Sequence, residues 1–354
     1  MSLNFAIMGC GRIARKHAEI LSGHFVRNAN LAAVCDSDFA RAAAFGEKYK
    51  VPAYPSLEEM VNCHPEIDAV NVLTPSGLHA EHAIRVANLG KHVIVEKPMA
   101  LKLSDADEMI RECDRNGVRL FVVKQNRFNL AVQKLHEALT AGRFGKIIYG
   151  TVRVRWCRTQ EYYDHDAWRG TWAYDGGVFS NQASHHIDLL EWMLGTPVSV
   201  YAMTRTALAH IETEDTGFAL IRFENGAIGS VEATTATRPK DLEGSISILG
   251  EKGSVVIGGF AVNQIQTWEF SERLPSDDTI IQDTLQTPPN VYGFGHIPYL
   301  ENVVDCILNR KHALVDGIEG RRSLELISAM YESSETGREV RLKYFPEKCK
   351  LGIR

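Results

Sequence analysis

Hydrophobic and polar positions along this chain follow one pattern up to about residue 124 and another beyond it. In the first part, short apolar runs alternate with stretches in which apolar residues recur every three or four positions. Such runs are typical of buried strands and such stretches of amphipathic helices, and their alternation predicts βαβ units around a parallel sheet. The predicted strands cover residues 5–8, 31–35, 69–73, 92–95 and 119–123, and the predicted helices cover 13–22, 39–49, 79–88 and 104–116.

Beyond residue 124 the chain first continues as a helix, predicted over 131–141, and then changes to alternating apolar and polar positions. Alternation is typical of half-buried strands, and Asn225 with Gly226 predicts a hairpin turn between two of them. The predicted strands cover 149–156, 198–205, 215–223, 227–234, 244–249 and 254–257, followed by helices over 291–308 and 321–336. We therefore expect two domains, an α/β domain at residues 1–124 and a sheet-dominated domain at 125–354.

Composition narrows the class of protein. The 354 residues carry a net charge of −5, with 45% hydrophobic and 23% charged residues, as in ordinary globular proteins. This charge offers no basic surface for nucleic acid, and no apolar stretch approaches the ~20 residues that a membrane span needs. The chain begins in a predicted strand rather than a signal peptide, and its seven cysteines include no CxxC pair. We expect a cytoplasmic protein with reduced thiols and no metal site, nucleic-acid partner or membrane anchor.

A glycine-rich turn joins the first predicted strand to the first predicted helix. It covers residues 9–14 with the sequence GCGRIA, in the strand–turn–helix context that dinucleotide binding requires. Gly9 allows the tight turn, Gly11 lets a pyrophosphate approach the backbone, and the helix N-terminus offers unpaired N–H groups. Asp36 ends the second strand, where a carboxylate binds the ribose hydroxyls and repels a 2′-phosphate. The cofactor expected in this Rossmann domain is therefore NAD rather than NADP.

A second motif, Glu96-Lys97-Pro98, follows the predicted strand at 92–95. Open α/β sheets bind ligands beyond the carboxyl ends of their strands, so a lysine stands where the nicotinamide is expected. Pro98 restricts the backbone of Lys97 and thereby limits where its ammonium points. Cofactor contacts are expected in this domain at Gly9, Gly11, Arg12, Ile13, Asp36, Ser37, Thr74, His79, Glu96 and Lys97.

The second domain carries a candidate catalytic helix. Paired glycines at 176–177 precede Asn181, His185 and Asp188, whose spacings of four and three predict that they lie on or near one helix face. A single histidine on an amphipathic helix is more often structural than catalytic, so the spacing alone does not decide the role of His185.

In these motifs and their order, the chain resembles the glucose–fructose oxidoreductase and inositol dehydrogenase (Gfo/Idh/MocA) family of NAD(P)-dependent sugar dehydrogenases over nearly its full length. The resemblance implies that the second domain is α+β with an open, mostly antiparallel sheet whose face commonly serves for oligomerisation. It also implies catalytic roles for Lys97 and His185, with Asn181 beside them, and cofactor contacts at Arg127, Trp168 and Arg169. Many members carry aspartate where this chain has Asn181. Because an amide cannot stabilise a charged imidazole as a carboxylate does, either Lys97 supplies more of the electrostatics or Asn181 serves the substrate.

Arginines and aromatic residues crowd residues 153–172, which suggests an anionic sugar derivative held by guanidinium forks and aromatic faces. The alternative is a sheet face whose arginines pair with acidic residues in an oligomer. With Asn181 and residues 292–296, this segment resembles the subgroup that oxidises carbon 3 of UDP-N-acetylglucosaminuronic acid, on the route to the diacetamido uronic acids of lipopolysaccharide O-antigen. Its substrate contacts are then expected at Lys97, Arg155, Arg158, Tyr163, Asn181, His185, Tyr292 and His296.

Two other functions stay open at this point, namely NAD-dependent oxidation of another sugar or inositol, and a non-catalytic NAD-binding regulator. The presence of both Lys97 and His185 speaks against a regulator, which needs neither base. The resemblance also leads us to expect a homotetramer.

Overall fold

The computed structural model describes residues 2–259, 262–285, 293–342 and 350–352. Its contacts divide the chain into two compact units. The N-terminal unit comprises Met1–Val123 and His296–Arg321, and the C-terminal unit comprises Lys124–Gly295 and Arg322–Arg354. The sequence-based division assigned all of 125–354 to the second domain, so it differs from the structure at 296–321.

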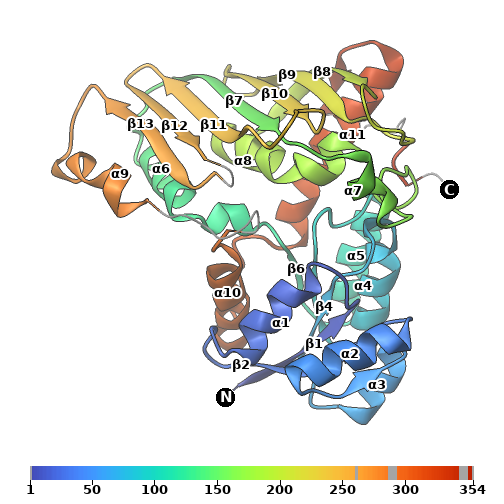
Figure 1. Ribbon diagram of the computed structural model, residues 1–354. Helices are drawn as coiled ribbons and strands as arrows, with labels where there is room; N and C mark the ends of the chain where they lie inside the picture. The colour runs from blue at the N-terminus through green and yellow to red at the C-terminus, as the bar shows by residue number, and fades with distance from the viewer. Residues whose placement is uncertain (1, 260–261, 286–292, 343–349, 353–354) are drawn as a thin grey trace. The chain divides into compact units, whose positions relative to one another are not determined.

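A parallel sheet forms the centre of the N-terminal unit (Figure 1), as predicted. Its six strands lie in the order β3-β2-β1-β4-β5-β6, and the order reverses direction between β1 and β4. This reversal is where doubly wound sheets bind their ligands. The strands are β1 (Leu3–Met8), β2 (Ala29–Cys35), β3 (Ala53–Tyr54), β4 (Ala69–Val72), β5 (His92–Val95) and β6 (Leu120–Val122).

The helices of this unit are α1 (Ala14–Ser22), α2 (Phe39–Tyr49), α3 (Leu57–Cys63), α4 (His79–Asn88), α5 (Leu103–Arg115) and α10 (His296–Asn309). The sequence analysis missed β3 and α3, because each is too short to show a period. Helix α3 is set by a cap instead, since Ser56 Oγ accepts the Glu59 N–H at 3.2 Å.

The chain returns to this unit through hydrogen bonds to β6 and its neighbour α5. Val122 N–H donates to Val315 O at 3.3 Å, and Phe121 and Asp316 form an isolated β-bridge. The Arg321 guanidinium donates to Asp107 at 2.5 Å. These contacts between distant parts of the sequence explain why the local pattern assigned the segment to the wrong side of the boundary.

The C-terminal unit is built on an eight-stranded sheet in the order β13-β12-β11-β7-β10-β9-β8-β14. Among the described strands, β10 runs parallel to β7 and the other neighbours pair antiparallel, which confirms an open, mostly antiparallel sheet. The strands are β7 (Ile147–Arg155), β8 (Pro197–Arg205), β9 (Thr216–Phe223), β10 (Ile228–Thr234), β11 (Glu243–Gly250), β12 (Gly253–Gly258), β13 (Gln264–Phe270) and β14 (Val340–Arg341). The helices of this unit are α6 (Leu130–Thr140), α7 (Gln160–Asp164), α8 (Ser184–Leu194), α9 (Ile280–Asp283) and most of α11 (Gly317–Thr336).

The two faces of this sheet differ in their environment. One face is buried against α8, where a Cβ on Gly150 would lie 2.8 Å from Leu194 and 3.1 Å from Leu190, so any larger residue would require these side chains to move. The other face is open, and its part on β8 and β9 is apolar, where the exposed fractions of Tyr201, Met203, Phe218 and Leu220 lie between 41% and 64%. In the part of the chain that the structure describes, no helix combines the length and the apolarity that a membrane span needs.

Candidate functional site

The glycine turn has the shape that a dinucleotide requires. Gly9 has φ +96°, and a Cβ on it would lie 2.9 Å from the backbone of Leu73, so only glycine allows this turn. A Cβ on Gly11 would meet no atom within 4 Å, so its backbone is open to a ligand. Helix α1 begins three residues later, at Ala14, and its first N–H groups suit a pyrophosphate. The residues present therefore fit the predicted cofactor.

Asp36, predicted to bind the ribose, also fixes the glycine turn. Its Oδ2 accepts the Cys10 N–H at 2.8 Å, and its Oδ1 accepts the Asp38 N–H at 2.9 Å. The carboxyl group is 9% exposed, and the Arg41 guanidinium lies 3.6 Å away on the solvent side of α2. A carboxylate held in this way presents negative charge at the end of β2, as the preference for NAD over NADP requires.

His79 was predicted to touch the cofactor, but the structure commits both of its ring nitrogens to backbone carbonyls. Nδ1 lies 2.7 Å from Pro98 O, and Nε2 lies 2.8 Å from Thr74 O. The ring is 1% exposed, and this burial lowers its pKa, against the opposing effect of the two carbonyls. His79 therefore ties the end of β4 to the turn after Lys97, while the Thr74 hydroxyl hydrogen-bonds to His82 at 2.9 Å.

Glu96 was predicted to contact the cofactor and His296 the substrate, and the structure buries both side chains. Glu96 is 7% exposed, and its Oε2 accepts the Lys97 N–H at 3.1 Å. His296, expected to bind substrate, is fully buried in the N-terminal unit, with Nε2 3.9 Å from Glu96 Oε1. Both side chains are thus internal, and Lys97 itself is half-buried. Tyr292, the other residue expected from this segment, lies outside the described residues.

The paired glycines in the C-terminal unit start a helix, but not the regular one that the spacing suggested. Residues Val178–Gln182 form a π-helical turn, and α8 begins only at Ser184. A Cβ on Gly177 would lie 2.0 Å from the Glu214 carboxylate, so the turn requires glycine. Asn181 therefore stands in a different turn from His185, and its amide donates to the Asp175 carboxylate.

His185 hydrogen-bonds to Gln125, which the sequence analysis did not select. The two Nε2 atoms lie 3.1 Å apart, His185 is 9% exposed and Gln125 is 5% exposed. With the amide as placed, His185 Nε2 accepts the hydrogen bond. Gln125 belongs to a polar run immediately after β6, at the carboxyl end of a buried strand. That position was the available signal, because polar residues there are commonly functional.

Asp188, one turn beyond His185, is the centre of a buried charge cluster. Its two oxygens accept from Arg127 Nε and Nη2 at 2.8 Å each, and Lys124 Nζ lies 3.7 Å away. The three side chains are 1%, 2% and 3% exposed, respectively. Burial raises the pKa of Asp188, but the two cations outweigh it and bring the pKa to about 2. Arg127, predicted to bind the cofactor, thus forms an ion pair with α8 through Asp188.

The two arginines predicted to bind the substrate, Arg155 and Arg158, both pair with carboxylates of the C-terminal unit. Arg155 lies on the sheet and pairs within the chain with Glu232 at 2.6 and 2.8 Å and with Glu243 at 3.2 Å. Arg158 pairs with Asp241 at 3.0 Å and lies over the Trp156 ring, with 5.2 Å between guanidinium carbon and ring centroid.

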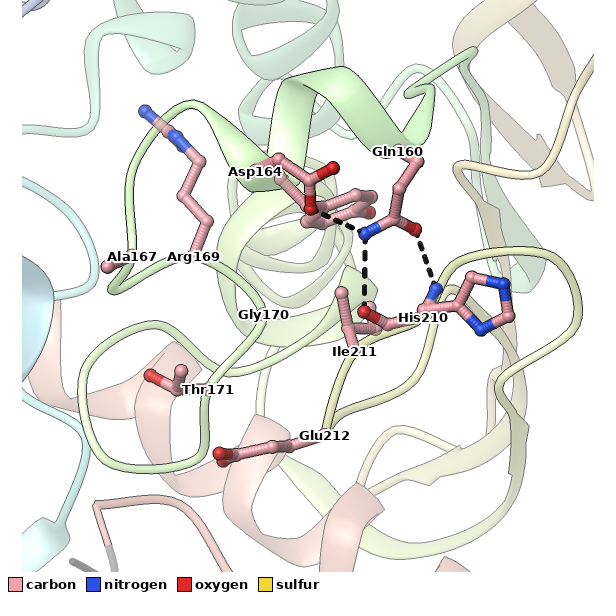
Figure 2. Close-up of a pocket in the computed structure, with 10 residues that line it drawn as sticks. Gln160, Asp164, Ala167, Arg169, Gly170, Thr171, His210, Ile211 and Glu212 are labelled. Atoms are coloured by element: carbon pink, nitrogen blue, oxygen red, sulfur yellow. Dashed lines mark hydrogen bonds between the residues drawn. The ribbon is translucent and has the colours of Figure 1, made fainter.

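Tyr163 and Arg169 instead line a cavity of about 550 Å³ within the C-terminal unit. Figure 2 shows this cavity between the loop after α7 and the segment around His210, with Gln160 hydrogen-bonded to Asp164 and to the His210 backbone. The Arg169 guanidinium donates to the Tyr162 hydroxyl at 2.7 Å, and lies 4.5 Å from the centroid of the Trp168 ring. Aromatic faces and a guanidinium therefore meet beside this cavity, where the predicted substrate contact Tyr163 lies with Trp168 and Arg169, which were predicted to contact the cofactor.

Comparison with known proteins supports the same interpretation. The family model described as an oxidoreductase family with an NAD-binding Rossmann fold matches residues 3–124, and that of the family's C-terminal alpha/beta domain matches residues 136–342. The WlbA dehydrogenase from Bordetella pertussis, solved with NADH and UDP-GlcNAcA, is 45% identical, with a TM-score of 0.91 over 96% of this chain and 97% of its own. The WlbA enzyme from Chromobacterium violaceum, solved with the same two ligands, is 46% identical, with a TM-score of 0.89 over 96% of each chain. The scyllo-inositol 2-dehydrogenase (NAD(+)) of Bacillus subtilis is 27% identical over 95% of both chains. The resemblance inferred from the motifs is confirmed, and the chain belongs to the Gfo/Idh/MocA family of NAD-dependent oxidoreductases.

Proposed function

We propose that this protein oxidises the 3-hydroxyl of UDP-N-acetylglucosaminuronic acid to a 3-keto sugar nucleotide, with NAD⁺ as the oxidant. One observation carries the proposal. The two dehydrogenases solved with NADH and UDP-GlcNAcA share 45% and 46% of their residues with this chain over nearly its whole length. The inositol dehydrogenase of the same family shares only 27%. A place in the synthesis of the diacetamido uronic acids of lipopolysaccharide O-antigen, in the cytoplasm, belongs to this proposal.

The residues of the N-terminal unit suit the cofactor's part of the reaction. Gly11 and the start of α1 bind the pyrophosphate, and Asp36 binds the adenosine ribose. When bound, NAD⁺ supplies the hydride acceptor. Lys97 donates a hydrogen bond to the oxygen on carbon 3 and stabilises the negative charge that develops there as the proton leaves.

In the C-terminal unit, His185 is the group that takes the hydroxyl proton. Its hydrogen bond to Gln125 holds the ring in place without adding a charge. An amide can donate to Nε2 or, after rotation, accept from it, so Gln125 supports whichever tautomer leaves a basic nitrogen for the substrate. An aspartate would stabilise the resulting imidazolium and Asn181 cannot, so the proton transfer depends more on the stabilisation that Lys97 gives to the negative charge on the carbon-3 oxygen.

The open sheet face is the feature that supports a homo-oligomer. Tyr201, Met203, Phe218 and Leu220 form an exposed apolar surface on neighbouring strands β8 and β9. Apolar patches of this kind commonly mark contacts between proteins. A homotetramer that covers these faces is our expectation, and sedimentation or light scattering of the purified protein tests it.

The experiment that tests the function mixes the protein with UDP-N-acetylglucosaminuronic acid and NAD⁺ and follows reduced nicotinamide and the sugar product together. A keto acid is supplied in parallel samples, so that tightly held NADH is reoxidised and turnover continues. We expect a 3-keto sugar nucleotide, identified by mass and NMR, and its loss in Lys97→Ala and His185→Ala. The proposal fails if no keto sugar appears under either condition. Turnover of an inositol instead would support the alternative of a dehydrogenase for another sugar or inositol. Binding of NADH without any turnover would support the alternative of a non-catalytic regulator.

A further inference from the structure

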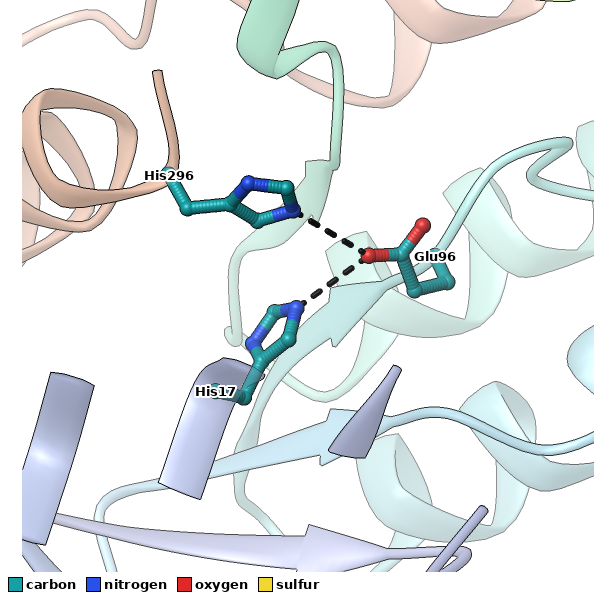
Figure 3. Close-up of side chains that lie close together, drawn as sticks. All are labelled: His17, Glu96 and His296. Atoms are coloured by element: carbon teal, nitrogen blue, oxygen red, sulfur yellow. Dashed lines mark hydrogen bonds and ion pairs between the residues drawn. The ribbon is translucent and has the colours of Figure 1, made fainter. Parts of the chain in front are cut away.

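Three buried side chains from distant parts of the sequence meet at one oxygen in the N-terminal unit. Figure 3 shows His17 of α1 and His296 of α10 pointing at Oε1 of Glu96, at the end of β5. The Nε2 atoms lie 3.1 Å and 3.9 Å from that oxygen, and the two histidine side chains are fully buried. The imidazole rings meet edge to face, with 5.5 Å between their centroids.

The hydrogen bond at His17 has a direction that the neighbouring Asn71 sets. Asn71, fully buried on β4, has its Nδ2 3.2 Å from His17 Nδ1. With this amide as placed, Nδ1 accepts, so the ring proton is on Nε2 and is donated to Glu96. The donated N–H favours an ionised carboxylate, because a hydrogen bond to a charged oxygen is stronger than one to a neutral carboxyl group.

The second oxygen of Glu96 connects this cluster to Lys97. Oε2 accepts the Lys97 N–H at 3.1 Å, so one carboxylate is hydrogen-bonded to the His17 imidazole through Oε1 and to the lysine backbone through Oε2. On the far side of the lysine, His79 binds the Pro98 carbonyl at 2.7 Å. The tripeptide is thus fixed at both ends by buried histidines.

We propose that Glu96 is a positioning residue for Lys97: hydrogen-bonded to His17 and facing His296, it fixes the lysine backbone and puts a carboxylate on the residue next to Lys97 in the chain. This inference rests on the role proposed above for Lys97. It also gives α1 a second role, since the helix that follows the glycine turn carries His17. The titratable groups that face Glu96 are His17 from α1, His79 from α4, and His296 and Tyr299 from α10, with Lys97 next to it in the chain.

The same three ligand atoms lie within 4.8 Å of one another, as a transition metal would require. Two observations favour the hydrogen-bonded cluster. His17 Nε2 lies at a hydrogen-bond distance from the carboxylate, and its other nitrogen is engaged by Asn71. Metal analysis of the purified protein is nonetheless part of the test.

The decisive variant is Glu96→Gln, which keeps the shape of the side chain and removes its charge. Its matched control is Glu66→Gln, which removes a histidine-bonded carboxylate at an exposed position in the same unit. Hydrogen exchange of the Lys97 amide, followed by mass spectrometry in protein without substrate, reports directly on the Oε2 bond. We expect faster exchange in Glu96→Gln than in wild type, and no change in Glu66→Gln.

Kinetics supply the second readout. In Glu96→Gln we expect kcat to fall about tenfold and the KM for NAD⁺ to change by less than about threefold, since the loss concerns the reacting group. The alkaline limb of the kcat–pH profile should shift to lower pH by about half a pH unit or more, because Lys97 loses the negative charge of the residue next to it. A merely structural glutamate would leave that limb in place.

The inference is overturned by a Glu96→Gln variant with wild-type amide exchange and an unmoved alkaline limb. It is also overturned by a stoichiometric metal ion that is lost in His296→Gln. If wild type itself shows no turnover, the proposed function fails, while amide exchange still decides the positioning role. If Glu96→Gln does not fold, His296→Gln carries both measurements, with the same expected directions and smaller effects.

Discussion

Replacing Asp188 by asparagine should destabilise the C-terminal unit strongly and in a pH-dependent manner. The carboxylate is fully buried and its pKa is lowered from 3.8 to about 2. A shift of this size corresponds to about 2.5 kcal/mol of stability at neutral pH. Because the folded pKa lies below the unfolded one, this stability is present above pH 4 and is lost as the pH falls towards 2.

Asp188→Asn also leaves the Arg127 and Lys124 charges buried without their counter-ion, which in other proteins costs about 3–5 kcal/mol. We therefore expect a loss of about 3 kcal/mol or more at pH 7. The difference from wild type should shrink at pH 3, where wild type begins to lose the same interaction.

The assay is urea unfolding followed by tryptophan fluorescence. All five tryptophans lie between Trp156 and Trp268, within the C-terminal unit, so the signal reports on this unit alone. The matched control is Asp278→Asn, which breaks an exposed pair with Arg273 and should cost less than about 1 kcal/mol. An Asp188→Asn variant within 1 kcal/mol of wild type at pH 7 would refute the reasoning.

Three further predictions concern other groups of the two units. Gln125→Glu puts a carboxylate against His185 and should raise the pKa of the histidine by about one to three units. The acid limb of the kcat/KM–pH profile should then shift to higher pH. An unshifted acid limb would argue against a role of this contact in catalysis. Burial raises the pKa of Glu214 to about 7, above its unfolded value, so wild type loses stability as the pH rises from about 4.5 through 7. Glu214→Gln should therefore gain up to about 3 kcal/mol over wild type at pH 8.5 and almost nothing at pH 4.5, in urea unfolding, and equal gains at both values would contradict it. Asp36→Ala should weaken the binding of NADH about tenfold in a fluorescence titration and reduce the ratio of the Kd for NADPH to the Kd for NADH. An unchanged ratio would show that Asp36 does not select between the two cofactors.

Much of the fold could be predicted because most helices and strands show a local period in their hydrophobic and polar residues. The predicted limits of α2 and α4 coincide with the observed ones, and the longer strands agree to within two residues. The missed elements are the short strands β3 and β14, strand β13, and the short helices α3, α7 and α9. Two-residue strands carry no period, and their pairing depends on a neighbour far along the chain.

For the candidate site, the sequence predicted individual functional residues but not the residues that contact them. Lys97 and His185 were selected because their motifs are local, but the partners that hold them are not. Gln125 is 60 positions from His185, and His296 is 200 positions from Glu96. His296 and Arg127 were assigned to ligands for the same reason, since the sequence does not show that carboxylates inside the protein already occupy them.

The regular helix expected through Asn181 and His185 failed for a steric reason. The backbone of Gly177 passes against Glu214, and this close approach accompanies a π-helical turn in place of the first regular turn. Asn181 and His185 are then joined through this irregular turn rather than through one regular α-helix. The glycines were the visible sign of this irregularity, because glycine is required where another side chain comes within 3 Å of a Cβ position.

The return of the chain to the N-terminal unit has a consequence for how the protein is made. A ribosome releases Met1–Val123 first, but that part cannot complete its fold until His296–Arg321 has followed. By then the whole segment from Lys124 to Gly295 has been synthesised and is free to form its own sheet. Until then Glu96 and His17 lack the His296 imidazole that faces them in the finished unit, and the apolar side chains of α10, such as Leu300 and Val303, are not yet buried. A shortened protein ending at residue 124 would remain in that state permanently, whereas one in which residues 1–123 are joined directly to 296–321 would contain every element of the unit.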